Sequence, residues 1–196
     1  MKKTLTAVLF VGGLSRRMGI DKATLEFAGE PLWARQLRQL RELKPDTLWI
    51  SARSRPPWCP PEIEVILDDP PSRGPLSGLD AALRRLQTSH LLALAIDLPR
   101  INVELLRKLW CLAQPGRGVV PVTALLEPLC AVYPVEAAMD AATSLKNPQD
   151  ASLQSFVHGL CRQERMRIYP CSESEQRFFS NMNRPEDFKS CLSNVD

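Results

Sequence analysis

Short apolar runs alternate with segments of helical spacing through the first half of the chain. Apolar residues recur every three or four positions after Pro31 and again over about 76–86, which predicts two helices. Apolar and β-branched runs predict buried strands at 4–10, 47–52, 64–67 and 90–96. Strands that alternate with helices form βαβ units, so the pattern predicts an α/β fold with a mostly parallel sheet.

The second half of the chain follows a less regular pattern. Helices are expected at 102–112, 135–143 and 152–161, with strands at 118–122, 128–133 and 166–169 and a short helix from Pro185. A short strand at 24–27 ends in an Ala28-Gly29 turn. No linker or repeat interrupts these elements, so we expect one domain over residues 1–196.

Composition narrows the classes of partner. The chain has 196 residues, of which 44% are hydrophobic and 24% charged, as in ordinary globular proteins. Its net charge of +3 is too small to indicate a nucleic-acid partner. The purest apolar run, at 91–96, suits a buried strand and is too short to span a membrane. Six cysteines without a Cys-x-x-Cys pair indicate reduced thiols in a cytoplasmic protein rather than a disulfide framework or a zinc site.

The first residues are compatible with a second interpretation. Met1 and two lysines precede an apolar run at 5–14, as in a secretory signal peptide. The run leads directly into Arg16 and Arg17, however, where a cleavage region needs small uncharged residues. We therefore expect this stretch to be a strand and a loop of the folded protein.

A glycine pair and three cations follow the first predicted strand. Gly12 and Gly13 allow backbone N–H groups to approach an anion, while Arg16, Arg17 and Lys22 add positive charge. Neither a Gly-x-Gly-x-x-Gly fingerprint nor a Walker A sequence is present. The stretch therefore predicts a triphosphate-binding loop of a different design.

Carboxylates follow two other predicted strands. In parallel sheets, ligands bind outside the carboxyl ends of the strands, where Asp68 and Asp97 are expected. Asp97 suits a Mg²⁺ ligand, because this ion takes one or two carboxylates together with substrate phosphates. The alternative is that Asp97 caps the turn that leads to Pro99. Asp68 and Asp69 are compatible with a metal pair, a nucleoside contact or solvated loop charges.

These motifs together resemble those of the molybdenum cofactor guanylyltransferases, the MobA family of nucleotidyltransferases. The resemblance covers nearly the whole chain, and its first block is the most specific. The matching blocks are Val11-Gly-Gly-Leu-Ser-Arg-Arg-Met-Gly-Ile-Asp-Lys22, Gly29-Glu-Pro-Leu-Trp33, Asp68, Gly74-Pro-Leu-Ser-Gly-Leu79, Asp97-Leu-Pro99, Glu127-Pro-Leu-Cys-Ala-Val-Tyr133 and Asn181-Met-Asn-Arg-Pro-Glu-Asp187. The block that begins at Gly74 favours the guanylyl branch over the related cytidylyltransferases.

The resemblance implies a Rossmann-like, three-layer α/β/α nucleotidyltransferase that uses GTP and Mg²⁺. Such an enzyme joins GMP to the phosphate of molybdopterin and releases pyrophosphate. The resemblance also implies transient contact with molybdoenzymes or other cofactor-biosynthesis proteins. By motif, the nucleotide would be bound by Phe10, Val11, Gly12, Gly13, Lys22, Ser51, Asp68 and Asp97. Asp97 would also bind the metal, and Asn181 and Asn183 would face the acceptor.

Catalysis would then depend on position and charge. The acceptor already carries a phosphate nucleophile, so Lys22, Arg17 and Asp97 with Mg²⁺ would align the reactants and neutralise the developing phosphate charge. Two alternatives remain open at this point. One is nucleotide transfer to another acceptor, such as a sugar phosphate, or CTP-dependent transfer to molybdopterin. The other is a nucleotide-binding partner protein without catalysis.

Overall fold

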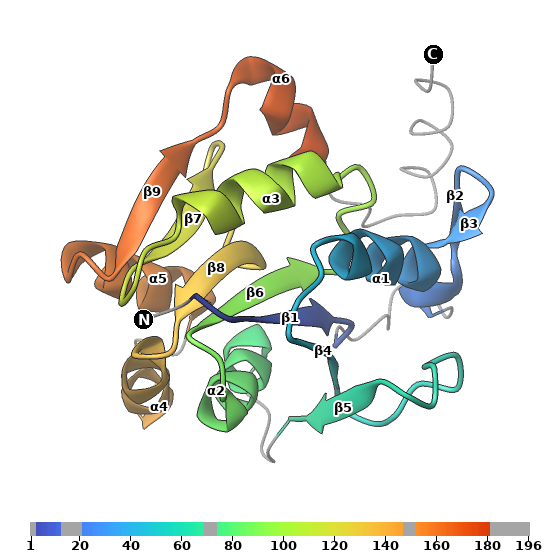
Figure 1. Ribbon diagram of the computed structural model, residues 1–196, viewed down its shortest axis with the longest axis horizontal. Coiled ribbons are helices and arrows are strands. Elements are labelled where there is room, and N and C mark those ends of the chain that lie inside the picture. The colour runs from blue at the N-terminus through green and yellow to red at the C-terminus, as the bar shows by residue number, and fades with distance from the viewer. Residues whose placement is uncertain (1–2, 13–20, 69–73, 147–151, 181–196) are drawn as a thin grey trace.

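A seven-stranded sheet forms the centre of the molecule (Figure 1). The computed structural model describes residues 3–12, 21–68, 74–146 and 152–180. The strands of the sheet lie in the order β5-β4-β1-β6-β8-β7-β9. Their bounds are β1 Leu5–Phe10, β4 Thr47–Ala52, β5 Glu64–Leu67, β6 His90–Ala95, β7 Gly118–Val122, β8 Cys130–Pro134 and β9 Met166–Pro170. β8 pairs antiparallel with both of its neighbours and every other pair is parallel, so the predicted mostly parallel sheet is confirmed.

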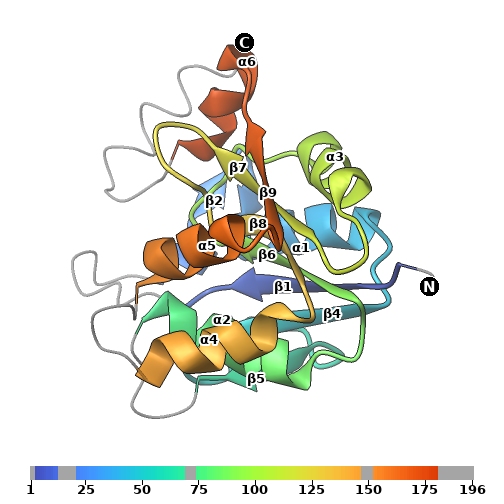
Figure 2. The same cartoon turned by 90° about the vertical axis from the view of Figure 1, so that its left-hand side faces the viewer.

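Helices cover both faces of this sheet and complete three layers. Helices α1 and α3 pack on one face, and α2, α4 and α5 on the other (Figures 1 and 2). The helix bounds are α1 Leu32–Glu42, α2 Pro75–Arg85, α3 Val103–Leu112, α4 Ala137–Lys146, α5 Leu153–Arg162 and α6 Glu173–Gln176. The described elements therefore have the predicted α/β/α architecture.

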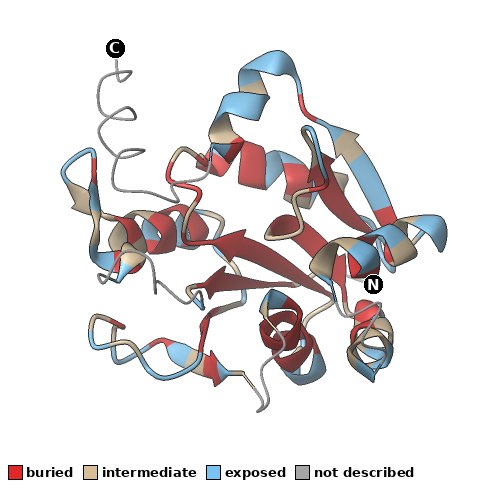
Figure 3. Cartoon of the chain, turned by 180° about the vertical axis from the view of Figure 1, so that it is seen from behind, coloured by how far each residue is buried: buried red, intermediate tan, exposed pale blue. Residues whose placement is uncertain are grey.

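Strand β1 contributes to the core on both faces. Side chains alternate across a strand, so Leu5 and Leu9 join the core beneath α1 and α3, whereas Val8 and Phe10 join the core beneath α2. All six residues of β1 are buried, and Figure 3 shows the same burial along the central strands. An apolar run of this kind, buried on both faces, is typical of a parallel sheet.

The segment before α1 differs from its prediction. Lys22–Thr24 forms a short 3₁₀ helix, η1, because the Asp21 carboxylate accepts a hydrogen bond of 3.0 Å from the backbone N–H of Ala23. The predicted strand at 24–27 is therefore shortened to β2, Glu26–Phe27, which pairs with β3, Glu30–Pro31. The turn between them lies at Ala28-Gly29 as expected, with both residues at positive φ.

The other predicted helices of the described ranges begin within two residues of their predicted starts. Asn102 caps α3 by accepting a 3.0 Å hydrogen bond from the N–H of Leu105, and Ser152 caps α5 in the same way. The sequence pattern missed α6 and the 3₁₀ turn η2, Arg177–Phe179. The helix predicted from Pro185 lies outside the described residues.

Two further expectations concern membrane-spanning helices and disulfide bonds. No helix among the described ranges is long and apolar enough to cross a membrane. The five cysteines in those ranges form no disulfide, and Cys191 lies outside them.

Gly118, at the start of β7, allows a very close contact between strands. A Cβ atom placed at this position would overlap the carbonyl oxygen of Val132 in β8 and come within 2.5 Å of the Met166 sulfur in β9. By contrast, a Cβ atom placed at Gly159 in α5 would have no heavy atom within 4 Å. Of these two glycines, only Gly118 is therefore required by packing.

We expect Gly118→Ala to lower the free energy of unfolding by about 3 kcal/mol, because the backbone of β8 must move to admit the methyl group. Gly159→Ala is the matched control and should raise it by roughly 0.5–1 kcal/mol through helix propensity. Urea denaturation of both variants measures the two effects. Equal stability of the two variants would contradict the packing seen around β7.

Candidate active site

The strands of the parallel half of the sheet are tied together just beyond their carboxyl ends. The backbone N–H of Val11 donates to the carbonyl of Ser51 at 3.0 Å, which joins β1 to β4. The N–H of Ile96 donates to the carbonyl of Phe10, also at 3.0 Å, which joins β6 to β1. These bonds fix the starts of the loops after β1 and β6 relative to β4 and to one another, so side chains on these loops share one edge of the sheet.

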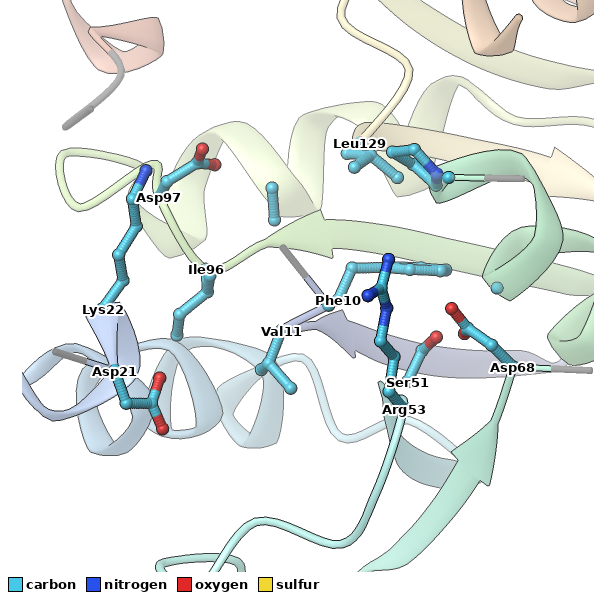
Figure 4. Close-up of a pocket in the computed structure, with 15 residues that line it drawn as sticks. Phe10, Val11, Asp21, Lys22, Ser51, Arg53, Asp68, Ile96, Asp97 and Leu129 are labelled. Atoms are coloured by element: carbon cyan, nitrogen blue, oxygen red, sulfur yellow. The ribbon is translucent and has the colours of Figure 1, made fainter. Parts of the chain in front are cut away.

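A pocket of about 270 Å³ opens at this edge (Figure 4). It lies where the connection from β1 runs outward to β4 and that from β5 returns across the sheet to β6, which is where open α/β sheets bind ligands. Its lining consists of Phe10, Val11, Gly12, Asp21, Lys22, Ser51, Arg53, Asp68, Gly74, Pro75, Gly78, Ala95, Ile96, Asp97 and Leu129. Residues from four strand ends and from the start of α2 therefore meet in one cavity.

Lys22 and Asp97 lie at one end of the pocket. The ammonium group of Lys22 points toward the carboxylate of Asp97 (Figure 4), although η1 and β6 are far apart in sequence. Burial raises the pKa of Asp97, while the charge of Lys22 opposes that rise. A partly desolvated carboxylate beside a lysine suits the binding of a polyphosphate and its counter-ion.

Lys22 is held in place by its neighbour in the chain. One oxygen of Asp21 caps η1, and the other accepts a 2.8 Å hydrogen bond from the indole nitrogen of Trp58. The Trp58 ring in turn stacks on Trp33 of α1, with ring centroids 5.4 Å apart and planes 16° from parallel. The proline-rich loop around Trp58 therefore braces the segment that carries Lys22.

The loop that follows Asp97 is held by α1. The side chain of Gln36 donates to the carbonyl of Leu98 at 2.7 Å, and that of Gln39 donates to the carbonyl of Ile101 at 3.2 Å. Arg35 adds a bond of 2.8 Å to the carbonyl of Pro99. Both glutamines are buried, so their bonds to this loop form where water cannot compete.

Ser51 and Asp68 lie at the other end of the pocket. Ser51 is buried and Asp68 half-buried, and both side chains face Gly78 in α2. A Cβ at Gly78 would lie 2.7 Å from the Ser51 hydroxyl oxygen and 2.9 Å from a carboxylate oxygen of Asp68. Glycine at this position therefore lets the helix approach these two polar groups.

The first turn of α2 closes one wall of the pocket. Gly74 precedes the helix with φ of 86°, and Pro75 occupies its first turn. Pro75 lacks an N–H group that would be unsatisfied at this position, and its fixed φ suits the start of a helix. The positive end of the helix dipole thus faces the cavity, which favours an anionic ligand.

Every predicted site residue within the described ranges lines this pocket. Phe10, Val11, Gly12, Lys22, Ser51, Asp68 and Asp97 all do so. Gly13, Arg17, Asn181 and Asn183 lie outside the described residues, so their predicted roles stay predictions.

Three charged residues at or near the pocket were not predicted as site residues. Asp21 and Arg53 line the pocket directly. Glu127 interacts electrostatically with Asp97, which contributes to its raised pKa after the larger effect of burial, while a 2.7 Å hydrogen bond from Thr123 lowers it. Glu127 belonged to a matching motif, but no sequence pattern indicated that it lies near Asp97.

The three-layer fold, the pocket at the switch point and the Lys22–Asp97 pair inside it define a nucleotide-binding domain of the nucleotidyltransferase class. The chain belongs to the family of MobA-like NTP transferase domains, whose model matches residues 7–165. The predicted nucleotidyltransferase and the predicted family are thereby confirmed.

Individual relatives extend the match over most of the chain. It is 36% identical to a probable molybdenum cofactor guanylyltransferase of Opitutus terrae, over 93% of this chain and 92% of the relative. It is 31% identical to the molybdenum cofactor guanylyltransferase of Pseudomonas fluorescens, over 91% and 89%. The crystal structure of molybdopterin-guanine dinucleotide biosynthesis protein A from Archaeoglobus fulgidus shares the fold, with a TM-score of 0.72, 23% identity and coverage of 96% and 97%.

We expect Gly78→Ala to weaken GTP binding about tenfold, because the new methyl group displaces Ser51 or Asp68 at the wall of the pocket. The helix itself should tolerate alanine, which has the higher helix propensity. Isothermal titration and thermal denaturation measure the two properties, with Gly159→Ala as a control outside the pocket. Unchanged GTP affinity would show that this contact has no role in binding. A large fall in melting temperature would show that the contact matters for the fold instead.

Proposed function

We propose that this protein transfers GMP from GTP to the terminal phosphate of molybdopterin, which forms the guanine dinucleotide cofactor and releases pyrophosphate. One observation carries the proposal. Lys22 and Asp97 meet in the pocket that Gly12 also lines, and the curated relatives that match more than nine-tenths of this chain are named for this activity.

Mg²⁺ is the proposed metal, and Asp97 is the residue that would hold it. Among the described residues, no group of three or more His, Cys, Asp or Glu side chains forms a complete protein cage for a metal. Mg²⁺ suits a site with one or two carboxylates, since phosphates and waters supply its other oxygen ligands. Asp97 and the nearby Glu127 fit that requirement. When bound there, the ion would neutralise charge on the phosphates of the nucleotide.

The reaction requires the two substrates to be aligned, and it does not require a strong base. A phosphate oxygen of the acceptor attacks the α-phosphorus of GTP, and the bond from that phosphorus to the bridging oxygen of pyrophosphate breaks. Lys22 would bind the triphosphate as a fixed point charge. Arg17 is proposed to assist in the same way. Positioning and charge neutralisation then account for the acceleration.

The alternative functions require different residues of the protein. Transfer from CTP would use the same triphosphate end and differ at the Ser51–Asp68 end, whereas transfer to a sugar phosphate would differ at the acceptor. A non-catalytic nucleotide-binding protein would not need the carboxylate of Asp97. The names of the curated relatives favour the guanylyl transfer over these alternatives.

The cytoplasm is the proposed location, because the unpaired cysteines suit a reducing compartment. Transient contact with molybdoenzymes or other cofactor-biosynthesis proteins is proposed on the function alone.

Product analysis tests the proposed function. Purified protein is incubated with molybdopterin, Mg²⁺ and either GTP, CTP or ATP, and the products are separated by chromatography and identified by mass. We expect the guanine dinucleotide and pyrophosphate with GTP only. A cytosine dinucleotide would favour the CTP-dependent alternative, and the absence of any dinucleotide would refute the proposal.

Asp97→Asn and Lys22→Ala should separate metal use from triphosphate binding. Asp97→Asn removes a negative charge beside Lys22, so GTP affinity should rise in EDTA, whereas the gain in affinity on adding Mg²⁺ should disappear. Turnover should fall about a hundredfold, roughly 2.7 kcal/mol. Lys22→Ala should weaken GTP binding about tenfold with or without the metal. Titration calorimetry measures both variants; a Mg²⁺ gain in Asp97→Asn equal to that of the wild type would disprove the assigned metal role.

A further inference from the structure

Arg53 presents an uncommitted positive charge to the pocket. It follows β4, its side chain is exposed, and it extends toward the region of the cavity where Ser51 and Asp68 lie (Figure 4). Within the ranges that the structure describes, its guanidinium has no ion pair or hydrogen bond. It also lines an adjoining hollow beside Trp58, so it stands between two open spaces.

Arg55, the next arginine along the chain, differs from Arg53 because its guanidinium makes hydrogen bonds within the protein. Arg55 donates to the carbonyls of Ile63 and Pro60 at 3.2 and 2.8 Å, and so closes the proline-rich loop. Arg55 therefore stabilises a loop of the fold, whereas Arg53, two residues earlier, is available to bind a ligand. Ordering so long a side chain costs conformational entropy, which a bidentate contact to a ligand would offset.

The two ends of the pocket differ in the ligand groups that they can accept. Lys22 attracts phosphates at one end. At the other end, the Asp68 carboxylate repels phosphate but accepts hydrogen bonds from N–H groups. We therefore expect the base of a nucleotide to lie toward Asp68. The side chain of Arg53 lies beside Ser51 on the same side of the pocket (Figure 4), so it can face another edge of the base.

We propose that Arg53 recognises guanine by donating two hydrogen bonds to O6 and N7 of the base. A guanidinium fork matches these two adjacent acceptors, and guanine alone among the bases presents both. Adenine places an amino donor where O6 would be, and cytosine offers an amino donor on the corresponding edge. Arg53 is therefore a specificity-determining residue, and this inference rests on the proposed guanylyl transfer.

The test compares base analogues in two arginine variants. Wild type, Arg53→Met and Arg85→Met are titrated calorimetrically with GTP, 7-deaza-GTP and ATP. The analogue 7-deaza-GTP keeps O6 and the triphosphate but lacks the N7 acceptor. Arg85 lies at the opposite edge of the sheet, near Thr47 and Glu64, so its variant is matched in charge without touching the pocket.

In the wild type and in Arg85→Met, we expect 7-deaza-GTP to bind about tenfold more weakly than GTP. In Arg53→Met, GTP should lose roughly 5- to 150-fold in affinity, and the two nucleotides should bind equally. The preference for GTP over ATP should shrink in the same variant. Melting temperatures are measured alongside, and an unchanged value for Arg53→Met shows that the fold is intact.

Other outcomes overturn the assignment in distinct ways. Equal losses for all three nucleotides in Arg53→Met would place the guanidinium on a phosphate. Unchanged affinities would leave it no role in binding. If the wild type forms the guanine dinucleotide but Arg53→Met keeps its sensitivity to N7, the proposed function stands and this inference fails. If the wild type binds no GTP, both fail together.

Discussion

The pocket depends on backbone hydrogen bonds that continue the sheet beyond the ends of its strands. The bonds from Val11 to Ser51 and from Ile96 to Phe10 keep the loops that follow β1 and β6 in register with the neighbouring strands β4 and β1. Their acceptor residues are buried, so breaking one bond would leave polar groups unsatisfied at a cost of about 1–3 kcal/mol each. Charged side chains that would repel or drift apart in solution are thereby held at fixed positions around one cavity.

Local patterns predicted the elements and the sheet edge because both arise from short-range rules. The apolar runs marked the parallel strands, and the position of Asp68 and Asp97 after such runs placed them at the ligand edge. The resemblance then indicated the family. Local rules were less successful at 24–27, where an Asp21 side-chain cap favoured a 3₁₀ turn over a longer strand.

The remaining features of the site depend on contacts between distant residues. Trp58 braces Asp21 across a separation of 37 positions, and Gln36 and Gln39 reach a loop 62 positions away. The proline-rich surroundings of Trp58 indicated only a loop, and a glutamine on a helix is usually solvated. Arg53 carried no signal either, since an exposed arginine after a strand becomes informative only once the cavity beside it is known.

The bonds from α1 to the loop after β6 have a consequence for how the site responds to a ligand. Moving that loop as a lid would deprive two buried glutamine amides of their acceptors, and the conformational penalty would arise before any ligand contact formed. Asp97 is thus preorganised: it behaves as a rigid anchor rather than as part of an induced fit. In the proposed reaction, the metal ion and the phosphates would adapt to the carboxylate, and little binding energy would be needed to bring the carboxylate to them.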